Sequence, residues 1–252
     1  MIPRLKNFVP PLDSFPYNPA KTVNVPGNGS ATITLNGRGA NAFGFVRILP
    51  FGSDLSVIEA DFTLNEDYNI IKDVQLSVVR QMFLRKDLLA PYIIKKNNDL
   101  LIELRNTSGN DQEVNIQLLG YDTPALNKLQ SEYQKQDLKQ PTPIFLYAKG
   151  EIQADGNNSP IEIKTKSVDV NLVRAAIKSD GDNDLKVTLQ LFNESIKNQV
   201  FVQQINDEYE NNYSLVPIVV GKNSPFRLLV TNSDIANPKT VSFLGEAYIY
   251  QS

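Results

Sequence analysis

Three residue types are absent from the chain: none of its 252 residues is cysteine, histidine or tryptophan. Nucleophilic and metal chemistry commonly needs an imidazole or a thiolate. The absences therefore exclude a Ser-His-Asp triad, a cysteine nucleophile, a disulfide framework and an ordinary zinc or iron site. Carboxylates, lysine, tyrosine and serine are the reactive side chains that remain.

Long apolar runs and a large charge of one sign are also missing. No window approaches about 18 consecutive apolar residues, so no membrane-spanning helix is expected, and no apolar stretch follows Arg4 and Lys6 as it would in a secretion signal. The 28 Asp and Glu residues nearly balance the 25 Lys and Arg residues. The chain thus lacks the basic excess of a nucleic-acid-binding protein, and we expect it to stay in the cytoplasm in which it is made.

The composition is that of a globular chain, with 41% hydrophobic and 21% charged residues. Its length suits one large β domain or two domains of about 100 residues. Short stretches of β-forming residues alternate with turns containing Asn, Asp, Gly and Pro, which predicts eight strands in each half. In the first half the predicted strands are 22–25, 31–35, 42–49, 55–64, 70–83, 92–95, 100–105 and 114–121. In the second half they are 144–152, 161–164, 168–177, 185–192, 199–205, 215–220, 226–231 and 241–250.

Two local predictions concern the first half. The turn sequence Pro-Gly-Asn-Gly at 26–29 separates the segments 22–25 and 31–35, which predicts that these two strands form a hairpin. Residues 84–90 are predicted to form a helical turn, because Pro91 would end it.

One longer helix is predicted between the two β-rich halves, from Asp122 to about Lys139. Asp122 or Thr123 can cap its free N–H groups, Pro124 suits its first turn, and prolines at 141 and 143 end it. Its apolar residues recur three or four positions apart, as on the buried face of an amphipathic helix.

The closing segments of the two halves share one pattern. Residues 100–108 form a predicted strand that ends in Asn-Thr-Ser and passes through a Gly/Asn/Asp loop into the alternating segment 114–121, which ends in Gly-Tyr. Residues 226–233 likewise end in Asn-Ser and pass through an Asp/Asn/Pro loop into 241–248, which contains a glycine and ends in Tyr. A pattern at the same place in each half predicts two tandem β-sandwiches of similar topology.

The first 20 residues contain five prolines, which disfavour both a helix and a central strand. Apolar side chains recur between the prolines, whereas a frayed tail is usually polar, although a frayed tail remains the alternative. We predict an extended arm that docks on a neighbouring molecule. Its candidate contact residues are Arg4, Lys6, Phe8, Phe15 and Tyr17.

Eight short strands in each half, two halves in tandem and a proline-rich arm in front make the chain similar to a known family. This organisation resembles the double jelly-roll major capsid proteins of icosahedral bacteriophages of the corticovirus and tectivirus type. The resemblance covers essentially the whole chain, but it is architectural and has no signature motif. It implies a virion protein whose three copies form a pseudo-hexagonal unit and whose arm reaches neighbours, minor capsid or vertex proteins, or an internal membrane. Larger members commonly have large loops on top of the rolls, and this sequence has little room for them.

Two acidic loops are candidate binding or catalytic sites. Asp180, Asp182 and Asp184 alternate with small or polar residues and present oxygen ligands suited to Ca²⁺, but Leu185 stands where the EF-hand pattern needs glycine. A solvated turn is therefore the favoured interpretation.

The second acidic loop has Asp207, Glu208 and Glu210 beside Tyr209 and Tyr213. This arrangement could serve a glycosidase carboxylate pair or a sugar-binding loop, yet the chain has no tryptophan to stack on a sugar. We favour an acidic surface loop there too.

Two further residue clusters do not indicate a function. The glycines of 36–41 match neither a dinucleotide-binding nor a P-loop motif. A modest group of basic residues is offset by nearby aspartates and indicates a solvated face. Its members are Arg80, Arg85, Lys86, Lys95 and Lys96.

The sequence therefore predicts an all-β fold of two tandem eight-stranded jelly-roll sandwiches joined by a short helix. We expect an arm at 1–21, a first sandwich at 22–121, a connector at 122–143 and a second sandwich at 144–252. The expected function is that of a non-enzymatic major capsid protein in a virion, assembled in the host cytoplasm as a homotrimer, with no cofactor unless the aspartate loop holds Ca²⁺. The alternatives are a phage decoration or head-fibre protein, a carbohydrate-binding or adhesion module, and last a glycosidase.

Overall fold

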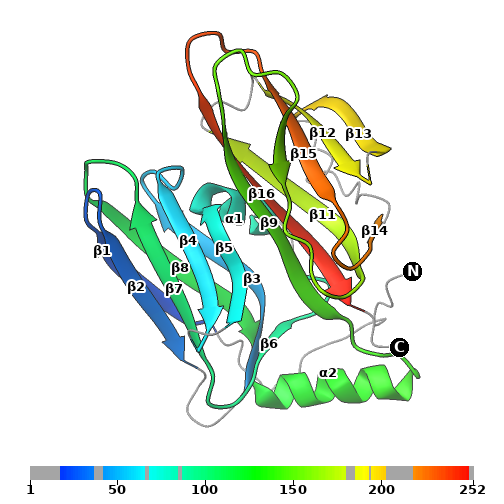
Figure 1. Ribbon diagram of the computed structural model, residues 1–252. Helices are drawn as coiled ribbons and strands as arrows, with labels where there is room; N and C mark the ends of the chain where they lie inside the picture. The colour runs from blue at the N-terminus through cyan, green and yellow to red at the C-terminus, as the bar shows by residue number, and fades with distance from the viewer. Residues whose placement is uncertain are drawn as a thin grey trace.

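The computed structural model describes residues 18–36, 42–65, 68–84, 87–179, 185–192, 194–202 and 218–249. Two β-sandwiches stand side by side, one built by strands β1 to β8 and the other by β9 to β16 (Figure 1). A short helix, α1, lies between the sandwiches, and a second helix, α2, lies across one end of the pair.

The first sandwich has two four-stranded antiparallel sheets, with strand orders β1-β8-β3-β6 and β2-β7-β4-β5. Consecutive strands mostly alternate between the two sheets, and this is the topology of a jelly roll. Alternating buried and exposed residues along β7 and β8 point one face of each sheet into the shared core. The strands are β1 (Ala20–Val25), β2 (Ser30–Asn36), β3 (Phe43–Gly52), β4 (Ile58–Leu64), β5 (Tyr68–Gln75), β6 (Tyr92–Ile94), β7 (Asp99–Asn106) and β8 (Gln112–Tyr121).

The second sandwich repeats this topology strand for strand, with orders β9-β16-β11-β14 and β10-β15-β12-β13. The predicted fold class of two tandem eight-stranded jelly rolls joined by a helix is confirmed. Residues 1–17 of the predicted arm lie outside the described residues, and Ala20 and Lys21, which the prediction also gave to the arm, belong to β1. The strands are β9 (Thr142–Ile152), β10 (Ser159–Glu162), β11 (Val170–Ser179), β12 (Leu185–Leu191), β13 (Glu194–Phe201), β14 (Ile218–Val220), β15 (Phe226–Asn232) and β16 (Lys239–Ile249).

Two buried asparagines mark the repeat at the end of β7 and of β15. Asn106 Nδ2 donates to Val25 O at 3.1 Å and to Asn110 O at 2.7 Å. Asn232 Nδ2 donates to Gln153 O at 3.1 Å and to Asn237 O at 3.0 Å. In both rolls the amide thus ties the loop after the strand to the end of the roll's first strand, so the shared Asn-Ser pattern has a structural cause.

The predicted hairpin between β1 and β2 is wrong. β1 pairs with β8 and β2 pairs with β7, so the turn at 26–29 carries the chain from one sheet to the other. At Gly27 a Cβ atom would lie 2.2 Å from Gly109 O, so only glycine fits where the two loops meet. The turn residues predict where the chain reverses but not whether its next strand joins the same sheet.

The predicted strand 70–83 is correct only as far as Gln75. Residues 76–83 form the helix α1 (Leu76–Phe83), whose residues Leu76, Val78, Val79, Met82 and Phe83 are buried. Two adjacent valines and a run of apolar residues favour a strand locally, but burial against both sandwiches selects the helix. The helical turn predicted at 84–90 is also wrong, because none of its described residues, 84 and 87–90, is helical.

The predicted connecting helix is confirmed but shorter: α2 spans Thr123–Lys135. Asp122 caps it, accepting from Ala125 N at 3.3 Å, whereas Thr123 Oγ1 donates to Ala42 O at 2.7 Å. Its buried side is Ala125, Leu126, Leu129 and Tyr133. Within the described residues, neither helix has the length and apolar character needed to cross a membrane.

Candidate functional site: the interface between the two jelly rolls

The two jelly rolls share one topology but contact each other through different elements. β5, α1 and the segment 87–92 of the first roll lie against β9, β11 and β16 of the second, that is, against the outer face of one of its sheets. Both faces of β9 and β16 are consequently buried. The sequence shows this directly, because Ile144 to Ala148 is an unbroken apolar run rather than an alternating one.

Aromatic side chains form the apolar centre of this interface. Phe145 of β9 packs edge-on against Phe83 of α1, with ring centroids 6.0 Å apart, and stacks near Tyr92 of β6 at 6.2 Å. Phe145, Tyr147, Ala176 and Leu244 all belong to the first roll's core cluster rather than to that of their own roll. The apolar area so removed from water stabilises one fixed arrangement of the rolls.

A buried polar cluster lies beside these rings. Arg174 of β11 forms an ion pair with Glu246 of β16, and both residues are nearly or fully buried. Tyr248 donates its hydroxyl hydrogen to Glu246, and burial together with that carboxylate raises the pKa of Tyr248 well above its usual value. The phenol therefore stays neutral and available as a hydrogen-bond donor at physiological pH.

This cluster holds the segment between α1 and β6. Arg174 donates to Asp87 O at 2.7 Å, and Leu89 N donates to the hydroxyl of Tyr248 at 2.7 Å. Breaking one member would leave a buried charge or amide without its partner, which costs far more than the intact cluster contributes. The arrangement therefore specifies the geometry of the interface more than its strength.

Polar contacts continue toward the rim of the interface. Lys149 of β9 reaches across to Glu59 of β4 at 2.5 Å, and Gln75 N donates to Ser242 Oγ at 3.4 Å. On the same sheet as Glu59, Arg105 of β7 bridges Asp61 of β4 and Asp73 of β5. Burial of Asp61 opposes its ionisation, but hydrogen bonds from Arg105 and from the Asp73 backbone still hold its pKa below the ordinary value.

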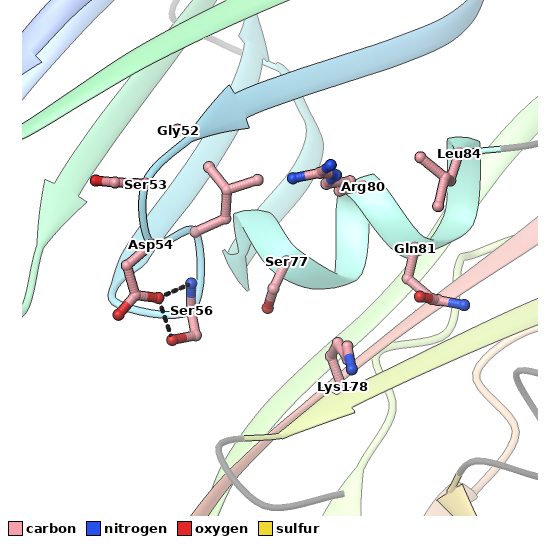
Figure 2. A pocket seen from close by; sticks show the side chains of 10 residues that line it. Gly52, Ser53, Asp54, Ser56, Ser77, Arg80, Gln81, Leu84 and Lys178 are labelled. Atoms are coloured by element: carbon pink, nitrogen blue, oxygen red, sulfur yellow. Dashed lines mark hydrogen bonds between the residues drawn. The ribbon is translucent and has the colours of Figure 1, made fainter.

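A cleft of about 390 Å³ opens between α1 and the end of β11 (Figure 2). Arg80 and Lys178 bring positive charge to it, while Asp54 is occupied by hydrogen bonds from the backbone and hydroxyl of Ser56. Ser77 Oγ is buried and makes no hydrogen bond to any described residue. No base lies against that hydroxyl, so the described groups of the cleft do not form a nucleophile-base pair.

Most of the sequence-predicted site residues lie outside the described part of the chain. These are the arm residues Arg4, Lys6, Phe8, Phe15 and Tyr17, the loop residues Asp180, Asp182 and Asp184, and the acidic segment 207–213. Among the described residues, no group of three or more Asp or Glu side chains is placed to hold a metal ion. Of the basic group, Arg80 lies over the Phe51 ring at 5.8 Å, and Lys95 and Lys96 are exposed.

The interface residues themselves were not predicted as a site. The unbroken apolar run of β9 signals a strand buried on both faces and could have indicated a covered sheet. The cluster of Arg174, Glu246 and Tyr248 has no comparable signal, because alternation with apolar residues is what any exposed sheet face would show.

Comparison with known proteins finds no matching family model and no matching curated protein. Solved structures of similar architecture do align along nearly the whole chain. The STIV MCP matches with a TM-score of 0.48 and 8% identity, covering 93% of this chain and 97% of that one. The major capsid protein P2 from Bacteriophage PM2 matches with a TM-score of 0.45 and 8% identity, covering 92% and 98%. A chain of Sulfolobus Turreted Icosahedral Virus matches with a TM-score of 0.45 and 9% identity, covering 93% and 90%.

Proposed function

We propose that this chain is a virion structural protein, the major capsid protein of an icosahedral shell. In this proposal, both jelly rolls of each copy stand in the shell, and three copies form a capsomer with six rolls around its centre. The unit would assemble in the host cytoplasm and remain in the virion. The protein needs no cofactor and performs no catalysis in this role.

The observation that carries the proposal is the duplication of one jelly roll within a chain, with the two copies fixed by a buried interface. A shell is built by repeating one contact many times, and a rigid pair of similar shapes supplies two repeats in each subunit. Jelly rolls of this topology serve in viral capsids, in lectins and in cupins. A histidine-bound metal centre is excluded by the composition.

We assign roles to the remaining segments on the same basis. Residues 1–21 would be an arm that reaches neighbouring capsomers, minor capsid or vertex proteins, or an internal membrane, using Arg4, Lys6, Phe8, Phe15 and Tyr17. Residues 122–143 would connect the two roll domains, 22–121 and 144–252. If a cation takes part, Asp180, Asp182 and Asp184 would bind Ca²⁺ between copies.

The oligomeric state of the purified full chain tests the proposal. Light scattering after size exclusion should give three times the chain mass of 28.2 kDa, and electron microscopy should show hexagonal outlines. Deleting residues 1–20 should leave these capsomers intact and abolish their further assembly. A chain that stays monomeric at all concentrations and binds glycans on an array would overturn the proposal in favour of a carbohydrate-binding module.

A further inference from the structure

The cleft between α1 and the end of β11 is shared by the two jelly rolls (Figure 2). The first roll contributes the loop 52–56 and one side of α1, and the second roll contributes Lys178. The side chains from α1 and its C-terminal end are spaced three or four positions apart, which places them on one face: Ser77, Arg80, Gln81 and Leu84. The volume of about 390 Å³ lies within the usual range of small-molecule sites.

The lining of the cleft is positive, although the chain as a whole carries a net charge of −3. Among its described lining residues, Arg80 and Lys178 face a single carboxylate, that of Asp54. Asp54 is held within its own loop, where it accepts from Ser56 N at 3.0 Å and from Ser56 Oγ at 2.5 Å. The guanidinium of Arg80 lies over the Phe51 ring at 5.8 Å and makes no ion pair with a described residue. The cleft is therefore suited to an anionic group.

The start of α1 adds to this positive charge. Throughout this helix, all of which is described, no acidic residue in the first turn and no side-chain cap compensates the helix dipole. Ser77, in that first turn, lines the cleft, so the positive end of the helix lies at its wall.

Two buried polar atoms beside the cleft make no hydrogen bond to any described residue. One is Ser77 Oγ, whose side chain extends from α1 toward β11 (Figure 2). The other is Oε1 of Gln75, a residue that is only 5% exposed and whose Nε2 donates to Ser56 O at 2.9 Å. Because buried polar groups are normally paired, an unpaired hydroxyl in the wall of a cleft indicates a ligand that forms hydrogen bonds.

Other lining groups suit a hydroxylated ligand rather than a bare ion. Ser53 and Ser56 donate their hydroxyl hydrogens within the first roll, at 2.6 Å and 2.5 Å, and each oxygen keeps a lone pair that can accept from a ligand hydroxyl. Leu55 and Leu84 add carbon surface against which the C–H groups of a ring can pack. Hydroxyls, cations and a small apolar surface together match the chemistry of a charged sugar.

We propose that this cleft binds an acidic sugar, that is, a hydroxylated ring that carries a carboxylate or a phosphate group. Arg80 and Lys178 bind the oxyanion from opposite rolls, and Ser77 Oγ forms a hydrogen bond with a ring hydroxyl. The inference goes beyond the proposed function, because it gives the chain a ligand and does not depend on the formation of a trimer.

The cleft lies at the end of β3 that is far from α2. Gly52, the last residue of β3, lines the cleft, whereas α2 packs against the start of that strand. β6 pairs with the same start of β3, and the turn that follows β6 carries the exposed Lys96. Lys96 therefore provides a matched control, a single cation at the opposite end of the first roll.

Isothermal titration calorimetry of the full-length chain tests the ligand class with four probes. These are glucuronate, glucose 6-phosphate, glucose and inorganic phosphate. Both acidic sugars should bind, about tenfold or more tightly than either glucose or inorganic phosphate, because only they use the cations and the hydroxyls together. Binding of neither acidic sugar, or binding of glucose or phosphate as tight as theirs, would show that the inference is wrong.

Three variants test the residues. Arg80→Gln keeps most of the side-chain stem and should weaken glucuronate binding about tenfold, whereas Lys96→Ala should leave it unchanged. Ser77→Ala should weaken it roughly fivefold without lowering the melting temperature, because the hydroxyl it removes has no partner in the fold. Equal losses in Arg80→Gln and Lys96→Ala, or unchanged binding in Arg80→Gln, overturn the inference.

Light scattering of the same samples separates this inference from the proposed function. A trimer that binds no acidic sugar overturns the inference and leaves the proposed function intact. A chain that binds acidic sugars through Arg80 but stays monomeric at all concentrations supports the inference and overturns the proposed function.

Discussion

The two jelly rolls have the same strand order and register, yet corresponding residues play different parts. Glu246 is fully buried in the second roll, where it lies opposite Arg174 directly after the bulge at Val173 and binds it. Its counterpart Leu119, opposite Arg47 directly after the equivalent bulge at Val46, is partly exposed in the first roll. Arg174 holds the neighbouring roll's backbone, while its counterpart Arg47 pairs with an aspartate on its own roll. A duplicated fold thus fixes where a contact can form, and the side chains decide whether it forms within one chain.

The largest expected difference between the rolls concerns the buried ion pair. Glu246→Ala leaves Arg174 buried without its carboxylate, so the free energy of unfolding should fall by about 3–5 kcal/mol. The equivalent change in the first roll, Leu119→Ala, removes a half-exposed side chain and should cost about 1 kcal/mol. Urea denaturation followed by circular dichroism measures both; equal losses would contradict the view that only the second roll's face is covered in the monomer.

The loop asparagines should behave alike, because the repeat gives them the same contacts. Asn106→Ala and Asn232→Ala each remove the two hydrogen bonds by which the amide ties the loop to the end of the first strand, and each should destabilise the chain by about 1–3 kcal/mol. Hydrogen exchange should show reduced amide protection in residues 106–112 of the first variant and in residues 232–238 of the second. A large effect at one position and none at the other would show that the two loops are not equivalent.

Protonation of Asp61 at acid pH should destabilise the first roll, and this is the smallest of the expected effects. The pKa of Asp61 lies below its ordinary value of 3.8 because of Arg105, and the bulge position equivalent to Asp61 in the second roll is Thr188, which does not titrate. The stability that ionised Asp61 contributes is therefore present above pH 3.8 and is lost as the pH falls through the lower folded pKa. Asp61→Asn should flatten the pH dependence of unfolding below pH 4, and an unchanged slope would argue against this role.

Sequence patterns predicted the strands well and their partners poorly. The alternation of residues 31–35 or 114–121 depends on one buried face, which any sandwich supplies, so these strands were correctly placed. Pairing depends on which sheet the chain enters next, and the turn at 26–29 carries no information about that. The strand predicted for 76–83 was wrong for a related reason, since burial between the two rolls, rather than local propensity, selects a helix there.

The candidate site was the least predictable part. The repeat that contains Asn106 and Asn232 predicted two similar sandwiches, and the apolar run of β9, which could have indicated the covered sheet, is also visible in the sequence alone. The roles of Arg174 and Tyr248 depend on the segment 87–90 of the other roll, which lies far away in sequence. The proposed metal and arm residues stay predictions, because they lie outside the described residues.

The most direct test of the account is a cryo-electron microscopy reconstruction of the assembled full-length chain. We predict a ring of three chains and six jelly rolls, in which each chain keeps β5 and α1 of its first roll against β9, β11 and β16 of its second. A reconstruction that shows only single chains, or an assembly in which the two rolls of one chain are separated, would contradict it.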